Sequence, residues 1–212
     1  MNASAATAGN NGAAIVGIDV SKWQGEVDFP KIKNAGYAYV FVKVSQGATG
    51  VDPQYAHNIA AARAAGLAAG SYHFYSTDHD AASQFANLSA HLDLKPGDLP
   101  PVVDIEVFAQ NSLPNLAAEL KQFLDAIENR YKAKPILYSG LSFAAQNLNG
   151  FGAYPLWLAE YNDAPAPRMP TGWTHWTFWQ YSQTGHAPGV NGNVDLDRFN
   201  GDAEQFRALL VA

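Results

Sequence analysis

Eight short runs rich in apolar, β-branched and aromatic residues recur along the chain, and they constrain its fold more than any other feature does. These strand-like runs are residues 13–21, 37–45, 67–75, 99–107, 135–140, 155–161, 177–182 and 194–199. Helical patterns follow each of the first four runs, and a last one closes the chain, at 28–36, 52–65, 78–92, 113–131 and about 202–210. Strands that alternate with helices predict a parallel sheet. We therefore expect an α/β fold, a TIM-like barrel of eight strands with about five helices, irregular in its second half.

The organisation of the chain points to one domain. No internal repeat or linker divides the 212 residues, so we expect a single barrel domain over residues 14–212. Residues 1–13 are rich in Ala, Asn and Gly and hold neither a positive charge nor a hydrophobic block. We expect a flexible N-terminal tail there, and this stretch as it stands does not have the pattern of a signal peptide.

Composition excludes several classes of function. The chain has no Cys, which rules out thiol catalysis and cysteine metal sites. Its net charge of −6, without a long run of Lys or Arg, disfavours nucleic-acid binding. No apolar run approaches the roughly 20 residues that span a bilayer, so we expect no membrane insertion. The six His residues are scattered without metal-site spacing, and we expect neither a metal nor another cofactor. His73 is the one that could line a barrel mouth.

Two carboxylates interrupt the most apolar of the strand-like runs. Asp104 and Glu106 lie in residues 99–107, bounded by prolines, and residues i and i+2 of a strand share a face with alpha carbons roughly 6.6 Å apart. Burying a carboxylate without partners is costly. One interpretation is that both acids lie past the strand end and cap the next helix or pair with a surface Lys. The other is a paired-carboxylate site, in which one pKa is raised and the other acid stays ionised.

More acids are expected at the same place. In a parallel barrel the site lies at the carboxyl ends of the strands. Asp19 ends the first run, Asp195 lies on the eighth, and these neighbouring strands face the fourth across the mouth. The aromatic and amide side chains expected to bind substrate there are Tyr72, Tyr138, Trp157, Tyr161 and Gln180. Such a pocket suits a neutral polyhydroxylated ligand and the chemistry of glycoside hydrolysis. An acidic mouth could instead bind Mg²⁺ or Ca²⁺.

Several longer motifs resemble one known family. They are residues 17–21 with 23–25, residues 70–74, 101–106 and 156–159, and residues 179–182 followed by 194–197. In this order they resemble glycoside hydrolase family 25, the Chalaropsis-type lysozymes or N-acetylmuramidases. The resemblance runs from about residue 15 to residue 199, nearly the whole chain.

The resemblance implies a flattened barrel of eight strands and five helices. It also implies cleavage, with retention of configuration and participation of the N-acetyl group, of the β-1,4 bond from N-acetylmuramic acid to N-acetylglucosamine in peptidoglycan. Carried onto this chain, it makes Glu106 the proton donor. Asp104 would polarise the N-acetyl group or stabilise the charge at the anomeric carbon, with Asp19 and Asp195 as supporting acids. We expect a monomer that acts on glycan strands after secretion or delivery to the cell wall or periplasm.

The chain departs from the family pattern at two places. It reads Ser45-Gln46-Gly47 where many members read Thr-Glu-Gly, and its last motif ends in Asp197 where Asn is frequent. Neither change touches Asp104 or Glu106, so we expect effects on subsite preference and pH optimum. Two other functions stay open at this point: a catalytically silent glycan-binding barrel, and a hydrolase of another N-acetylated glycan such as chitin.

Overall fold

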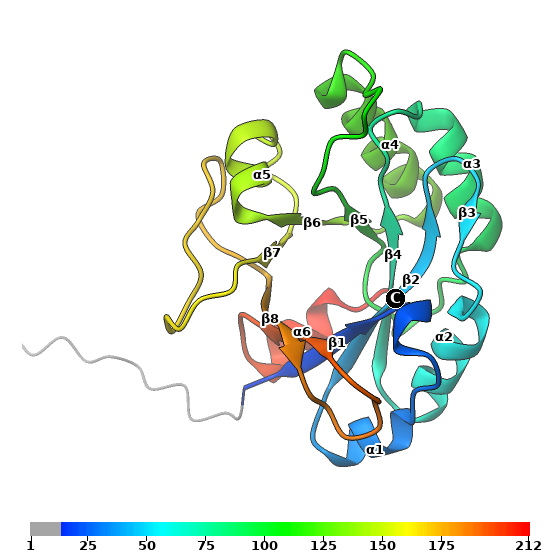
Figure 1. Cartoon of the computed structure of the whole chain (residues 1–212), viewed down its shortest axis with the longest axis vertical. Coiled ribbons are helices and arrows are strands. Elements are labelled where there is room, and N and C mark those ends of the chain that lie inside the picture. Colours follow the sequence, from blue (N-terminus) through cyan, green and yellow to red (C-terminus); the bar gives the residue numbers. More distant parts are fainter. Residues whose placement is uncertain (1–13) are drawn as a thin grey trace, which may run out of the picture.

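A closed barrel of eight strands forms the centre of the molecule in the computed structural model, which describes residues 14–212 (Figure 1). The strands are β1 (Val16–Val20), β2 (Tyr39–Gln46), β4 (Ala68–Phe74), β5 (Val102–Asp104), β6 (Ile136–Gly140), β7 (Leu156–Ala159), β8 (Phe178–Gly185) and β9 (Val194–Phe199). Their order around the barrel follows the chain, and pairing of β1 with both β2 and β9 closes it. The two-residue β3 (Gly50–Val51) only extends β2 as a hairpin. The predicted eight-stranded α/β barrel is confirmed.

The prediction of an all-parallel barrel is wrong at the last strand. Strand β9 runs antiparallel to both of its neighbours, β8 and β1. The reason is the length of the connection, because residues 186–193 are too few for a parallel crossover, which needs a dozen or more residues. The chain therefore turns back as a hairpin. As a result, the first residues of β9 lie at the same end of the barrel as the last residues of the parallel strands.

Helices cover the barrel unevenly. The described residues contain α1 (Phe29–Asn34), α2 (Tyr55–Ala64), α3 (Ala81–His91), α4 (Leu116–Tyr131), α5 (Leu141–Asn147) and α6 (Ala203–Leu209), with a 3₁₀ turn η1 (Lys22–Gln24). Helices α1 to α4 flank the first half of the barrel, whereas only α5 and long loops accompany β6 to β8 (Figure 1). The irregular second half is thus confirmed, but α5 was missed. It follows β6 without a loop, and seven residues carry little helical periodicity.

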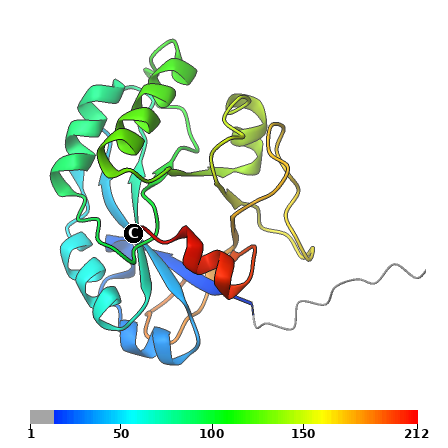
Figure 2. The same ribbon diagram turned by 180° about the vertical axis from the view of Figure 1, so that it is seen from behind.

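Two apolar cores hold these layers together. One lies between the strands and the surrounding helices, and the other fills the barrel with aromatic side chains such as Tyr39, Phe41 and Phe178. Phe206 of α6 packs on Tyr39, at the start of β2, and α6 thereby covers the end of the barrel opposite the strand carboxyl ends (Figure 2). With one end of the barrel covered by α6, a ligand has access from the opposite end.

Glycines make room for the rings inside the barrel. Gly17 is the cross-strand partner of Tyr39, and Gly70 is the partner of Phe41. A Cβ atom at Gly17 would lie 2.2 Å from the Tyr39 ring, and one at Gly70 would lie 2.4 Å from the Phe41 ring. Both distances are far below van der Waals contact, so each large ring on β2 occupies the space that its small neighbour leaves.

The central strand is shorter than its apolar run predicts. Strand β5 spans only three residues, of which Asp104 is the last, so Glu106 belongs to the segment that follows the strand. The two acids therefore do not share one strand face. The capping alternative also fails, because the next helix, α4, begins only at Leu116, and within residues 14–212 neither acid forms an ion pair. None of the helices described here is both long and apolar enough to cross a membrane.

Candidate active site

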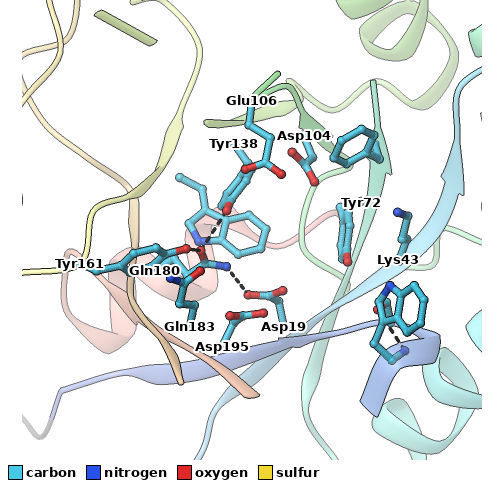
Figure 3. A pocket seen from close by; sticks show the side chains of 14 residues that line it. Asp19, Lys43, Tyr72, Asp104, Glu106, Tyr138, Tyr161, Gln180, Gln183 and Asp195 are labelled. Atoms are coloured by element: carbon cyan, nitrogen blue, oxygen red, sulfur yellow. Dashed lines mark hydrogen bonds between the residues drawn. The ribbon is translucent and has the colours of Figure 1, made fainter. Parts of the chain in front are cut away.

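A cavity of about 280 Å³ opens at the carboxyl end of the barrel strands (Figure 3). All nine side chains predicted from the sequence line it, namely Asp19, Tyr72, Asp104, Glu106, Tyr138, Trp157, Tyr161, Gln180 and Asp195. Figure 3 shows Asp104 and Glu106 on one side of this cavity and Asp19 and Asp195 on the side opposite. The convergence expected from strand order is therefore present.

Asp195 reaches the mouth for a different reason than predicted. It is the second residue of β9, and in a parallel strand that position would lie at the far end of the barrel. Because β9 is antiparallel, Asp195 instead pairs directly with Asp19 at the mouth. Burial raises the pKa of the Asp19 carboxyl, and the nearby carboxyls of Asp197 and Asp195 raise it further. Burial also raises the pKa of Asp195.

Asp104 and Glu106 differ in their access to solvent. Asp104 is only 6% exposed, and burial followed by repulsion from Glu106 raises its pKa well above the usual range. Glu106 is partly exposed, and its pKa is also raised by burial, with an opposing effect from Lys43. The Oδ1 atom of Asp104 is buried and has no hydrogen-bond partner among the described residues. This oxygen is available to accept a hydrogen bond from a ligand.

Gln180 ties the two sides of the mouth together. The hydroxyls of Tyr138 and Tyr161 both donate to its Oε1, at 2.9 Å and 2.6 Å, and its Nε2 donates to Asp19 Oδ2 at 2.7 Å (Figure 3). A carboxylate only accepts hydrogen bonds, so the amide turns its Nε2 toward Asp19 and its Oε1 toward the two hydroxyls. Asp19 is consequently held in one position by a hydrogen-bond network whose outer member, Tyr161, is 46% exposed.

Trp157 forms the floor of the cavity instead of an exposed platform. Its indole is 2% exposed, stacks on Phe41 with ring centroids 4.3 Å apart, and donates from Nε1 to Asp197 Oδ1 at 2.8 Å. Asp197 is fully buried, and burial raises its pKa well above the usual value. The second oxygen of this carboxyl is buried and has no hydrogen-bond partner within the described chain.

His73 does not line the mouth. Its ring is fully buried on β4, where Nδ1 lies 2.8 Å from the Ser45 hydroxyl and Nε2 lies 3.4 Å from Gln84 Oε1. Gln84 Oε1 also accepts from the Ser76 N–H, so Nε2 of His73 carries the proton and Nδ1 accepts from Ser45. Burial lowers the pKa of His73 to about 4. This histidine is a neutral part of the core.

Five lining residues were not among the predicted site residues, and they are Ser21, Trp23, Lys43, Phe74 and Gln183. Lys43 carried a usable signal, because it is a charge in the apolar run of β2, as the two acids are in theirs. Trp23 lies in a motif used for the resemblance, but sequence alone did not show that its side chain is 80% exposed at the rim. Within residues 14–212, no three His, Asp or Glu side chains are arranged to hold a metal ion.

An α/β barrel with carboxylates and aromatic side chains at its strand ends has the architecture of a glycoside hydrolase site. The family model of the glycosyl hydrolases family 25 matches residues 18–190. The chain belongs to this family.

Curated relatives and solved structures agree with this assignment. Lysozyme M1 of Streptomyces globisporus is 32% identical over 211 residues, which cover 93% of this chain and 71% of the relative. The uncharacterized protein YegX of Escherichia coli K12 is 36% identical over 202 residues, covering 92% and 73%. The crystal structure of a bacterial lysozyme from Streptomyces coelicolor superposes with a TM-score of 0.87 at 30% identity, covering 93% of this chain and 97% of the other.

Proposed function

We propose that this protein is a muramidase, which hydrolyses the β-1,4 bond between N-acetylmuramic acid and N-acetylglucosamine in peptidoglycan. The observation that carries the proposal is the pair of carboxyls at the mouth, Asp104 and Glu106, with raised pKa values and a free buried oxygen on Asp104. Similarity to proteins named lysozymes supports the choice of substrate. We assign the activity to a single catalytic domain over residues 14–212.

Glu106 is the proton donor in this mechanism. A general acid must reach the glycosidic oxygen and hold its proton near neutral pH. Glu106 lies at the rim of the cavity with partial exposure, and burial already raises its pKa. A bound glycan excludes water from the carboxyl, which raises its pKa further. The proton passes to the leaving oxygen as the glycosidic bond breaks, and Glu106 becomes the base for the incoming water.

Asp104 stabilises the positive centre through the substrate's acetamido group. Its free Oδ1 accepts the acetamido N–H, and this hydrogen bond favours the ionised form of a carboxyl that is otherwise easily protonated. The acetamido oxygen then attacks the anomeric carbon as the bond to the leaving group breaks. Water, deprotonated by Glu106, opens the cyclic intermediate from the opposite face. Two inversions give net retention of configuration.

The remaining residues shape the environment of the anomeric carbon. Asp19 and Asp195 lie across the cavity from the acid pair and contribute negative potential toward an oxocarbenium-like centre. Gln180 with Tyr138 and Tyr161 holds Asp19 in place and presents polar groups to sugar hydroxyls. Tyr72 and the Trp157 floor complete the sugar-binding surface. The mechanism uses no cofactor.

The substrate sets the place of action. Peptidoglycan lies outside the cytoplasmic membrane, so we propose that the protein reaches the cell wall or periplasm by secretion or by delivery from elsewhere. No nucleic-acid partner enters this account, and the catalytic unit acts as a monomer.

The test compares insoluble peptidoglycan with a chitin oligosaccharide, using Glu106→Gln as the inactive reference and Glu204→Gln, an exposed residue of α6, as the matched control. The wild-type protein and Glu204→Gln should release soluble fragments from peptidoglycan much faster than they cut chitin. Glu106→Gln should release almost none. Binding of peptidoglycan without release would support the silent barrel, and faster cleavage of chitin would support the other hydrolase.

A further inference from the structure

A second cavity adjoins the mouth of the barrel. It has a volume of about 120 Å³ and lies between η1 and the β2–β3 hairpin. Its lining residues are Lys22, Trp23, Lys43, Gln46, Gly50, Val51 and Asp52. Trp23 and Lys43 line both cavities, so the two lie next to each other at one side of the mouth. An extended ligand can therefore occupy both at once.

The two cavities differ in charge. Four carboxyls and one lysine line the mouth, whereas two lysines and one aspartate line the second cavity. Asp52 already serves the backbone, because its Oδ2 accepts from the Lys22 N–H and its Oδ1 from the Gln54 N–H, both at 2.9 Å. The second cavity is thus the positive side of an acidic groove.

Neither lysine forms an ion pair with a carboxylate in the part of the chain that the structure describes. Lys43 Nζ donates to the neutral amide oxygen of Gln46 at 2.9 Å and lies 4.8 Å from the centre of the Phe74 ring. Lys22 Nζ lies 4.8 Å from the centre of the Trp23 ring. Figure 3 shows Lys43 beside the cavity, apart from the four carboxylates. Both ammonium groups keep donors available for an anion.

Trp23 stands at the boundary of the two cavities with a firmly held backbone. Its indole is 80% exposed, while the turn η1 that carries it is closed by a capping box between Ser21 and Gln24. An exposed indole on an ordered turn is a flat apolar surface that suits the face of a sugar ring.

We propose that the second cavity binds an anionic substituent of the glycan, with Lys22 and Lys43 as its cationic partners and Trp23 stacking on the adjoining sugar. This inference rests on the proposed function. In peptidoglycan, N-acetylmuramic acid bears a lactyl group whose carboxylate is either free or extended by a peptide with carboxylates of its own. The acidic mouth repels these groups and the lysines attract them, so the direction of the bound strand is fixed. Chitin lacks such a group and loses this contribution.

The test uses three soluble glycans. The first carries peptides, and the second has its peptides removed so that the lactyl carboxylate is free. The third is the second glycan with each lactyl carboxylate converted to its neutral methylamide. The readout is the ratio of KM on the methylamide to KM on each carboxylate-bearing strand. In the wild-type protein this ratio should exceed one and fall with added salt. In Lys22→Gln it should fall by about two- to five-fold, as expected for one exposed charge. Lys33→Gln, an exposed charge change on α1, should keep the wild-type ratio.

Trp23→Ala should raise KM on all three strands, because stacking does not depend on charge. If Lys22→Gln lowers only the ratio measured with peptide-bearing strands, the site binds the peptide carboxylates. If it also lowers the ratio measured with peptide-free strands, the site binds the lactyl carboxylate. An unchanged ratio in Lys22→Gln would overturn the proposal. If the wild-type protein cuts none of the strands, the muramidase assignment fails separately, and the same ratio taken from dissociation constants decides the binding proposal.

Discussion

Asp104 and Glu106 are two residues apart in the sequence, yet the fold gives them different surroundings. Asp104 ends β5 and is buried, whereas Glu106 lies beyond the strand with partial access to solvent. A charged residue inside an apolar run was enough to identify both acids as candidate site residues. Lys43 has the same signal but was missed, since a single lysine in a strand is more often a solvated side chain. The exposure of Trp23 depends on how η1 leaves β1, which local sequence does not determine.

The roles of the two acids can be separated by the leaving group. Glu106→Gln should lower turnover on a natural glycan by roughly 10²–10⁴-fold, the usual loss for a general acid, and should recover much of the bond-cleavage rate on an activated aryl glycoside. Asp104→Asn should be slow on both substrates, because it lacks electrostatic support for the positive centre. Single-turnover rates give the comparison. Equal recovery by both variants, or recovery by Asp104→Asn alone, would show that the roles are assigned wrongly.

His73 should make stability depend on pH in the acid range. Its folded-state pKa of about 4 is below the ordinary value of 6.5, so the unfolded chain binds more protons between these values. The free energy of unfolding therefore rises with pH from about 4 to 6.5 through this residue, by roughly 3 kcal/mol at most. Urea denaturation at several pH values should show a shallower rise in His73→Gln than in the wild-type protein. Parallel curves for the two proteins would argue against this contribution.

The pattern of apolar runs placed the strands, and the main error concerned direction. A strand-like run does not reveal whether it pairs parallel or antiparallel, and the short connection before β9 was the one available indication. The position of Asp195 at the mouth was nevertheless predicted, because the first and last strands of a closed barrel are neighbours. Helix α5 was not predicted, because its seven residues are too few to show a helical period. The pairs of a glycine with a large ring inside the barrel were not predicted either, because they depend on the register between strands.

Packing of β2 against β4 should depend on the glycine at position 70. A methyl group in Gly70→Ala would lie 2.4 Å from Phe41 Cδ1 and 3.2 Å from Leu99 Cβ, so we expect a loss of about 1–3 kcal/mol in the free energy of unfolding. Gly140→Ala is the control, because its Cβ meets nothing within 4 Å and its φ is −70°. Replacing Phe41 by Leu in the Gly70→Ala background should restore part of the loss. Urea denaturation gives the comparison. A denaturation midpoint of Gly70→Ala equal to that of Gly140→Ala would contradict this account of the barrel interior.

At the scale of the whole molecule, the two ends of the barrel differ in structure and charge. Helix α6 covers one end, and the other carries the acidic mouth, with a lysine-lined cavity beside it. Charges of opposite sign are thus segregated around one opening in a protein whose net charge is −6. This arrangement suits a long glycan that is neutral along its backbone and anionic at regular substituents.

Turnover should not depend on a metal ion. In the proposed mechanism, one carboxyl group donates the proton and others stabilise the positive centre, so no step needs a metal ion. Dialysis against EDTA should leave the rate of peptidoglycan solubilisation unchanged. A loss of activity that Mg²⁺, Ca²⁺ or Zn²⁺ restores would show that the acidic mouth works as a cation site.

The central claim is the identity of the bond that is cut, and the new reducing end reports it directly. Peptidoglycan digested by the protein can be reduced with borohydride, so that each new reducing sugar becomes its alcohol, and the fragments can be sequenced by mass spectrometry. We predict that the reduced sugar is N-acetylmuramic acid, as N-acetylmuramitol. Fragments that end in reduced N-acetylglucosamine would contradict the account.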